Sequence, residues 1–336
     1  MFMKKRLVIL TKNYGYNFTG ATMATAKYVE EWSAYYDEIV IYSLCTGEVF
    51  PHQNVKIKEY KSIFLLFYSL LVHEYGMKNT NYYSDDHLGF LYGILRKKYI
   101  HTYHGNWPDA ARSDILMAIK SLYFIPLYVL TLFFAKQVVN VSRYMEKYTK
   151  FINKHSVVIH NGMDVKVRKT ARFYKDVCLM VGNVDNRKYL YLLKLLNVCA
   201  KSQKTIKVHI YGKIVSCALK NKLEKFDGVK FMGMVRHIPY SSYPLLLNLS
   251  KIENLSISVC EAIANKIPVV CFHVGGLSEV VVSGKTGLVV TPFDVNEILA
   301  SIKVLFENQM NVDASVLDDY DWHKSSKKYM NLFLDN

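Results

Sequence analysis

Two glutamates in the second half of the chain stand at a spacing that bears on chemistry. Glu253 and Glu261 are eight residues apart, so about 12 Å would separate them along the axis if both were helical. The paired carboxyl groups of a glycoside hydrolase flank one bond at roughly 5 to 9.5 Å, so a two-carboxylate hydrolysis site fits this spacing poorly. A long ligand held at two points fits it better.

The residues around these glutamates predict a loop followed by a helix. A helix that begins near Ser256 or Ser258, with a hydroxyl accepting from free backbone amides, leaves Glu253 in the loop and puts Glu261 about two turns into the helix. Burying a carboxylate without a partner costs several kcal/mol. We therefore expect Glu261 to meet either a ligand or a neighbouring lysine.

The apolar run from 267 to 274 predicts a strand buried on both faces, because its apolar residues do not alternate with polar ones. Gly275 and Gly276 follow it directly. In parallel α/β sheets, ligands bind outside the carboxyl ends of the strands. This glycine pair therefore marks an expected ligand-binding edge.

The chain as a whole runs twice through alternating strand and helix patterns, which predicts an α/β protein with two doubly wound domains and a cleft between them. We expect an N-terminal domain over residues 1–165 and a C-terminal domain over 166–321, with a hinge near 164–172. Residues 322–336 have the pattern of an amphipathic helix. That helix either caps the second domain or crosses back to the first.

The composition is that of a globular protein, because 51% of the residues are hydrophobic and 21% are charged. The early apolar run at 7–10 is too short for a signal peptide, and the six cysteines show no CxxC spacing. We therefore expect a cytoplasmic protein with reduced thiols. The net charge of +15 comes without a nucleic-acid-binding motif, so anionic lipid surfaces and phosphate-bearing ligands are the expected partners rather than nucleic acid.

Two apolar tracts favour contact with lipid. Residues 63–72 follow several lysines, and residues 115–135 contain a single charge, Lys120, and a central proline, Pro126. The second tract is long enough to span a membrane, but the proline interrupts it. We expect a core helix of the first domain there. A face that rests on the inner surface of the cell membrane is the second interpretation.

The segment from Leu249 to Val290 resembles the signature region of the retaining glycosyltransferases of the GT-B fold, the group-one family (glycosyltransferase family 4-like). It has a serine, a glutamate, seven residues and Glu-Ala, then Pro-Val-Val, Gly-Gly, a glutamate and Gly-x-x-Gly. Further matches occur in order along nearly the whole chain: TGA at 19–21, TYHG at 102–105, VVNVSRYMEKY at 138–148, VVIHNGMD at 157–164, LMVGNVDNRK at 179–188 and VKFMGMV at 229–235.

The resemblance implies two Rossmann-like domains that face each other across a cleft. The second domain would hold a nucleotide-diphosphate sugar, with a UDP-sugar as the favoured donor, and the first would bind the acceptor. The reaction implied is transfer of a hexose to an acceptor hydroxyl with retention of configuration, without a metal or other cofactor. A glycan or lipid-linked acceptor in bacterial surface polysaccharide synthesis is expected, and the last helix would cross back onto the first domain.

Under this resemblance, five residues have roles in the reaction. Lys188 matches the family's phosphate lysine, and the amide of Gly20, ahead of the first helix, would meet the far side of the diphosphate. Glu261 is similar to the residue that accepts hydrogen bonds from the ribose hydroxyls. Glu253 matches the residue near the donor sugar and the reacting centre, and His104 matches the histidine beside the sugar and the acceptor.

Four other residues also match the family pattern, two of them glycines and two of them polar. Gly275 and Gly276 would let their loop approach the donor closely. Asn161, as a donor-binding residue, and Ser142 are weaker matches, because turn or cap roles explain them nearly as well.

The chain also departs from the family pattern. Asn183 stands where an arginine is usual, so Arg187 or Lys213 would have to supply the missing cation of the diphosphate clamp. If neither does, the protein is a non-catalytic GT-B partner or chaperone that recognises a glycosylation acceptor. Lys266 replaces a glycine, so the helix before it must end with a less favourable backbone.

Overall fold

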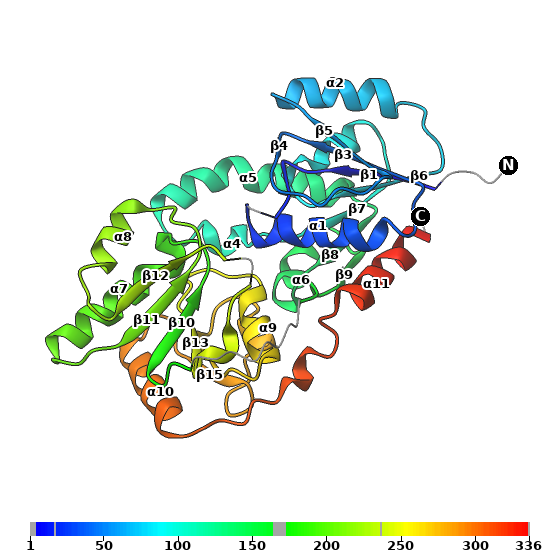
Figure 1. The fold of residues 1–336 in the computed structure, drawn as a ribbon. Helices are drawn as coiled ribbons and strands as arrows, with labels where there is room; N and C mark the ends of the chain where they lie inside the picture. Colours follow the sequence, from blue (N-terminus) through cyan, green and yellow to red (C-terminus); the bar gives the residue numbers. More distant parts are fainter. Residues whose placement is uncertain (1–4, 17, 164–172, 236, 335–336) are drawn as a thin grey trace. The chain divides into compact units, whose positions relative to one another are not determined.

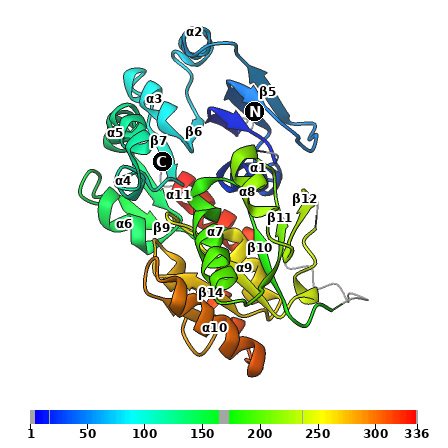
Figure 2. The same ribbon diagram turned by 90° about the vertical axis from the view of Figure 1, so that its left-hand side faces the viewer.

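The structure is a computed structural model that describes residues 5–16, 18–163, 173–235 and 237–334. The chain divides into two compact units (Figures 1 and 2). The first consists of Met1–Gly162 and Asp319–Asn336, and the second of Met163–Asp318. The sequence placed the boundary at 165 and 166. The expected hinge at 164–172 lies outside the described residues.

The first unit is built on a seven-stranded parallel sheet in the order β5-β3-β1-β6-β7-β8-β9. Because the order reverses beside the first strand, the switch point of this sheet lies between β1 and β6. The strands are β1 (Arg6–Leu10), β3 (Glu38–Ser43), β5 (Val55–Glu59), β6 (Thr80–Ser84), β7 (Tyr99–Tyr103), β8 (Gln137–Asn140) and β9 (Ser156–Val158), with β2 (Asn13–Tyr14) and β4 (Cys45–Thr46) paired separately.

Two hydrophobic cores lie on opposite faces of this sheet. One contains residues of α1 (Gly20–Trp32) and α11 (Trp322–Leu334). The other contains residues of α2 (Ile63–Glu74), α3 (Phe90–Ile94), α5 (Ile115–Phe134) and α6 (Arg143–Thr149). The short helix α4 (Trp107–Ala110) and the 3₁₀ helix η1 (His87–Gly89) pack against α5.

The terminal helix crosses back to the first unit rather than capping the second. It packs against α1, where the rings of Trp322 and Tyr329 lie 5.2 and 4.8 Å from the ring of Tyr28. The Tyr329 hydroxyl also lies 2.8 Å from the Thr102 hydroxyl in β7. The apolar stripe read from the sequence is therefore buried, with Trp322, Tyr329 and Phe333 inside.

Helix α5 corrects one expectation, because it is not a core helix. Only Ser121, Thr131 and Leu132 of its residues are buried, whereas Leu122 is 78% and Phe133 65% exposed. The helix lies against α3, α4 and η1 on the outside of one sheet. Only a narrow stripe of its side chains packs against these elements, and its other side chains face outward. By length and composition it is the one described helix that could cross a membrane, and 17% of its 18-residue apolar window is buried.

The second unit contains a six-stranded parallel sheet in the order β12-β11-β10-β13-β14-β15. Its switch point lies between β10 and β13. The strands are β10 (Val177–Val181), β11 (Lys207–Tyr211), β12 (Val229–Gly233), β13 (Leu245–Asn248), β14 (Val269–Phe272) and β15 (Gly287–Val290). All four residues of β14 are buried, as its continuous apolar run predicted.

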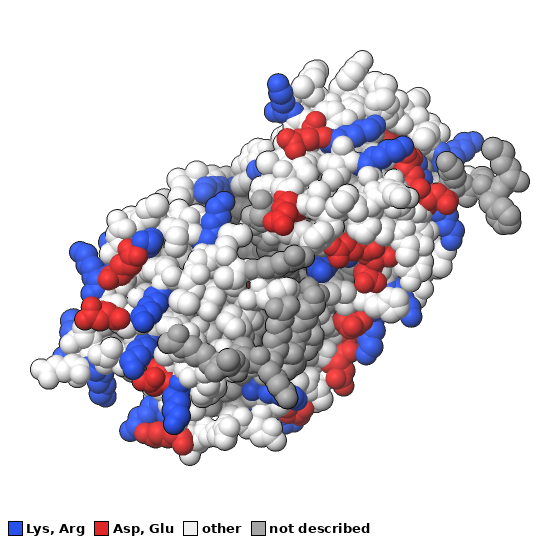
Figure 3. Space-filling view, in the orientation of Figure 1, with Lys and Arg blue, Asp and Glu red and all other residues white. Residues whose placement is uncertain are grey.

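The helices of the second unit complete the α/β alternation and confirm the predicted fold class. They are α7 (Asn186–Lys201), α8 (Cys217–Leu223), α9 (Ile257–Ala264) and α10 (Val295–Glu307), with the 3₁₀ helices η2 (Tyr240–Ser242), η3 (Leu277–Glu279) and η4 (Ala314–Leu317). Lys and Arg side chains are scattered over the face shown in Figure 3, with Asp and Glu among them. This dispersed pattern differs from the clustered basic patch of a nucleic-acid-binding protein.

Candidate active site

The switch point of the second sheet brings together two residues that the sequence singled out. Lys188 follows β10 and Glu253 follows β13, and these strands are neighbours. The Lys188 Nζ lies 3.3 Å from Glu253 Oε2, and both side chains are largely buried. Ligands of open α/β sheets bind at such positions. A cation and a carboxylate therefore meet at the expected binding edge.

The start of α7 positions Lys188. Asp185 is the N-cap, and its Oδ1 accepts hydrogen bonds from the amides of Arg187 at 2.9 Å and Lys188 at 3.1 Å. Gly182 has a φ of +140°, and a Cβ there would come 2.9 Å from Lys188 Cδ. A glycine is needed at this turn because both the backbone and the passing lysine exclude a side chain.

The loop that carries Glu253 is held by the glycine pair after β14. Gly275 has a φ of +57°, and a Cβ there would lie 1.8 Å from the Glu253 carbonyl oxygen. The Gly276 amide donates to the Asn254 carbonyl at 2.7 Å, and the Ser250 hydroxyl donates to Glu253 Oε2 at 3.3 Å. Gly275 is thus needed for a close contact between loops, and the predicted approach of the two glycines to a donor stays a prediction.

Glu261 lies in the second turn of α9, and its partner is a residue that the sequence reasoning missed. The Tyr240 hydroxyl donates to Glu261 Oε2 at 2.6 Å. Burial, and then the neighbouring carboxylate, raises the pKa of Tyr240 well above its usual value. A phenol from η2 is thus one partner of this carboxylate. No sequence pattern links two positions 21 residues apart.

The predicted start of α9 is confirmed, with Ser256 as its N-cap, but the expected hydroxyl cap is wrong because Ser256 makes no side-chain hydrogen bond to the helix amides. Its hydroxyl lies 3.0 Å from that of Ser258 instead. The strained helix end is confirmed, since Lys266 has a φ of +61°.

Asn183 stands where an arginine is usual, and the two cations that could replace that arginine, Arg187 and Lys213, have different surroundings. Arg187 is half-exposed, and its Nη2 lies 2.9 Å from Asp185 Oδ2, so its charge is partly neutralised. Lys213 is exposed just beyond β11, and its carbonyl accepts from the Val184 amide at 2.9 Å. Asn183 is half-buried beside Gly182. The ion pair with Asp185 makes Arg187 the weaker candidate for the role of the arginine, and a role for Lys213 stays a prediction.

The other predicted residues belong to the first unit. Gly20 is the exposed first residue of α1, behind the Thr19 cap. His104 follows β7, and burial lowers its pKa to about 4, so the ring is neutral at pH 7. Asn161 is buried, and its Oδ1 accepts from Tyr28 Oη at 3.4 Å. Ser142 caps α6 by accepting from Met145 N at 3.2 Å, which is the cap role left open for it.

The switch point of the first sheet holds a carboxyl pair that the sequence reasoning did not select. Asp85 and Asp86 follow β6, and Thr25 Oγ1 in α1 donates to Asp85 Oδ2 at 2.5 Å. Burial, and then the charge of Asp86, raises the pKa of Asp85 to about 7. Two acidic residues directly after a buried strand were the signal that could have identified this position.

A family model and a curated relative each match part of the chain. The family model described as "Glycosyl transferases group 1" matches residues 175–308. The poly(ribitol-phosphate) alpha-N-acetylglucosaminyltransferase of Staphylococcus aureus is 23% identical over 197 residues, which cover 54% of this chain and 39% of that protein. The chain therefore spans well under half the length of this curated relative.

Solved structures extend the likeness to the whole chain. HepE of Anabaena, in complex with UDP and glucose, superposes with a TM-score of 0.75 at 16% identity, covering 99% of this chain and 100% of that one. Sucrose-phosphate synthase from Thermosynechococcus elongatus gives 0.81 at 17% identity and 98% coverage of both chains.

The fold is thus that of the GT-B glycosyltransferases, and the resemblance to group 1 that the motifs predicted is confirmed over residues 175–308. These matches support glycosyltransferase activity. In the part of the chain that the structure describes, no group of three or more His, Cys, Asp or Glu side chains is arranged to hold a metal ion. Metal independence nevertheless stays a prediction.

Proposed function

We propose that this protein is a retaining glycosyltransferase that moves a hexose from a nucleotide-diphosphate sugar to an acceptor hydroxyl, without a metal or other cofactor. The observation that carries the proposal is the Lys188–Glu253 pair at the switch point of the second sheet. It supplies one cation for a departing diphosphate and one carboxylate near a sugar carbon that gains positive charge. Fixed charges aimed at developing charge are the largest contribution to many enzymatic rates.

The roles of the other residues follow from this placement. Lys188 would bind the diphosphate, and Glu261, held by Tyr240, would accept hydrogen bonds from the ribose. In the first unit, the Gly20 amide would bind the far phosphate. The neutral His104 would hydrogen-bond the sugar or acceptor. HepE was solved with UDP and with UDP-glucose, which supports a UDP-sugar as the donor to test first.

The acceptor is proposed to be a surface polysaccharide or a lipid-linked glycan. Support comes from the activities of similar proteins. One transfers N-acetylglucosamine to poly(ribitol-phosphate), and another is a lipopolysaccharide outer core galactosyltransferase that superposes with a TM-score of 0.68.

We place the protein in the cytoplasm, in peripheral contact with the inner face of the cell membrane. Helix α5 exposes most of its apolar residues, and Phe64 of α2, on the same face of the sheet, is 76% exposed. Large exposed apolar surfaces mark interaction sites, and lysines near α2 suit anionic lipid. Sedimentation with phosphatidylglycerol vesicles at low salt tests the contact, which is excluded if the protein stays in the supernatant.

Release of UDP from a panel of UDP-sugars tests the transferase itself. We expect slow release without acceptor by the wild type, and a loss of release in Lys188→Ala. Asn183, at the position of the usual arginine, is the one observation that favours the non-catalytic alternative. A wild type that binds acceptor glycan and releases no UDP from any donor would establish that alternative.

A further inference from the structure

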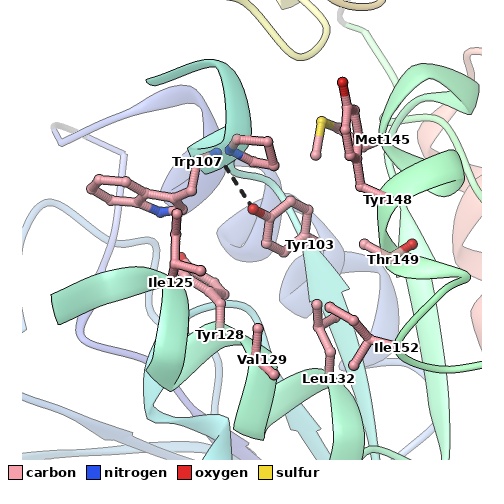
Figure 4. Close-up of a pocket in the computed structure, with 11 residues that line it drawn as sticks. Tyr103, Trp107, Ile125, Tyr128, Val129, Leu132, Met145, Tyr148, Thr149 and Ile152 are labelled. Atoms are coloured by element: carbon pink, nitrogen blue, oxygen red, sulfur yellow. Dashed lines mark hydrogen bonds between the residues drawn. The ribbon is translucent and has the colours of Figure 1, made fainter. Parts of the chain in front are cut away.

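An apolar pocket in the first unit lies between α4, α5 and α6, at the carboxyl end of β7 (Figure 4). Tyr103, the last residue of β7, lines it, and Val129 and Leu132 project into it from α5. Tyr148 and Ile152 enclose it from α6 and the residues that follow. Its volume is about 60 Å³, and it is partly open to solvent.

The chemistry of the lining excludes polar ligands. None of the eleven lining side chains is charged. Two of the hydroxyls already have protein partners, since Thr149 donates to Asn140 Oδ1 at 2.9 Å and Tyr103 accepts from the Trp107 amide at 3.4 Å. A sugar, nucleotide or diphosphate would lose its hydration here without replacement, which costs several kcal/mol.

The size of the pocket selects among apolar ligands. An engineered cavity that binds benzene has a volume of roughly 150 Å³, and this pocket has about 60 Å³. A ring system does not fit into such a space, whereas a short methylene segment does. The occupant that fits is therefore part of a flexible hydrocarbon chain.

The surroundings indicate where such a chain comes from. Val129 lines the pocket and also lies on the exposed apolar side of α5, and Phe151, next to Ile152, is 92% exposed. The apolar surface of α5 therefore continues into the pocket. Lys147 and Lys150, both exposed, belong to the same segment as Tyr148. Such lysines complement the phosphate of a lipid headgroup.

The pocket also lies beside a residue of the first unit that we propose to meet the acceptor. His104 directly follows Tyr103, and consecutive Cα atoms are 3.8 Å apart. A chain bound in the pocket is thus anchored within a few ångströms of the histidine proposed to meet the acceptor.

We propose that this pocket binds a methylene segment of the hydrocarbon chain of a lipid-phosphate-linked acceptor. The inference rests on the proposed function, because it assigns the acceptor class of that reaction. The pocket holds the chain near the headgroup while α5 faces the bilayer. The donor site in the second unit takes no part in this contact.

Photolabelling tests the inference with the full chain and no donor. The probe is dodecyl phosphate with a diazirine on the carbons next to the phosphate, used below its critical micelle concentration. We expect labelled peptides from 103–108, 125–132 and 145–152. Ile152→Trp and Val129→Trp fill the pocket and should reduce the labelling about tenfold. This is the change in affinity expected when about two methylene groups of the probe are no longer buried. Val129→Leu is a milder filling variant in case tryptophan disrupts folding.

The matched control is Leu122→Trp on the outer side of α5, which should label like the wild type. Any of three results overturns the inference. These are label confined to the outer side of α5, equal label in the wild type and the filled variants, and no label at all. Because no donor is present, these outcomes are independent of UDP release. If the pocket is labelled but the protein releases no UDP, the inference about the pocket stands and the proposed transferase activity is wrong.

Discussion

Lys188 Nζ lies 3.3 Å from Glu253 Oε2, across the point where the strand order of the second sheet reverses. The two residues are 65 positions apart in the chain, and parallel pairing of β10 with β13 brings them together. An ion pair of this kind contributes little to stability when it is partly exposed. The effect of the pair is to fix the position of the Lys188 ammonium group beside the Glu253 carboxylate before any ligand binds.

We predict that Lys188→Ala lowers UDP release from the preferred UDP-sugar by about a hundredfold or more, the usual loss when one charge-stabilising donor is removed from an active site. A coupled assay of free UDP measures it. Arg187→Ala is the matched control, and since that arginine is half-exposed and paired with Asp185, we expect a change below about fivefold. Equal losses in the two variants would contradict the assignment.

Glu261→Ala should weaken UDP binding by about tenfold or more, since hydrogen bonds to a charged group contribute about 1.5–3 kcal/mol. Inorganic diphosphate, which lacks ribose, should bind both proteins alike, and titration calorimetry measures both ligands. Tyr240→Phe removes the donor that holds the carboxylate and should weaken UDP binding to a smaller degree. An equal loss for diphosphate and UDP would remove Glu261 from the ribose site.

Gly275→Ala should destabilise the protein more than Gly284→Ala, although both glycines have positive φ angles. At Gly284 a Cβ meets no atom within 4 Å, so only backbone strain of about 1 kcal/mol is expected. At Gly275 the Cβ would also strike the Glu253 carbonyl, so the loop must move. Thermal unfolding measures the difference, and UDP release should fall in Gly275→Ala. Matching melting temperatures would show that the contact is unimportant.

Asp85 should make stability depend on pH. Its pKa is about 7 in the folded state and near 3.9 in an unfolded chain. Between these values the folded protein binds a proton that the unfolded chain has lost, so the contribution of Asp85 to stability falls as pH rises from about 4 to 7 and is constant above.

Asp85→Asn removes this titration. The melting temperature of the variant relative to wild type should therefore increase from pH 5 to pH 8, as followed by thermal unfolding at several pH values. Parallel profiles for the two proteins would show that Asp85 is ionised throughout.

Much of the fold could be read from local pattern. The buried strand β14 and the buried stripe of α11 follow from hydrophobic periodicity, which acts over a few residues. The serines also marked the start of α9, although Ser256 makes no side-chain cap. The prediction of a core helix at 115–135 was wrong, because composition shows that a segment is apolar but not which elements cover it. Burial depends on neighbouring elements, and α5 has them on one side only.

The sequence by itself determined the alternation of strands and helices, the glycines that the turns require, and the residue types of the site, because each depends on local backbone chemistry. Only the tertiary structure decided that Lys188 meets Glu253, that Tyr240 donates to Glu261, and that the last helix returns to the first unit. Such pairings depend on strand order and on packing between segments far apart in the chain, and local patterns carry no information about either.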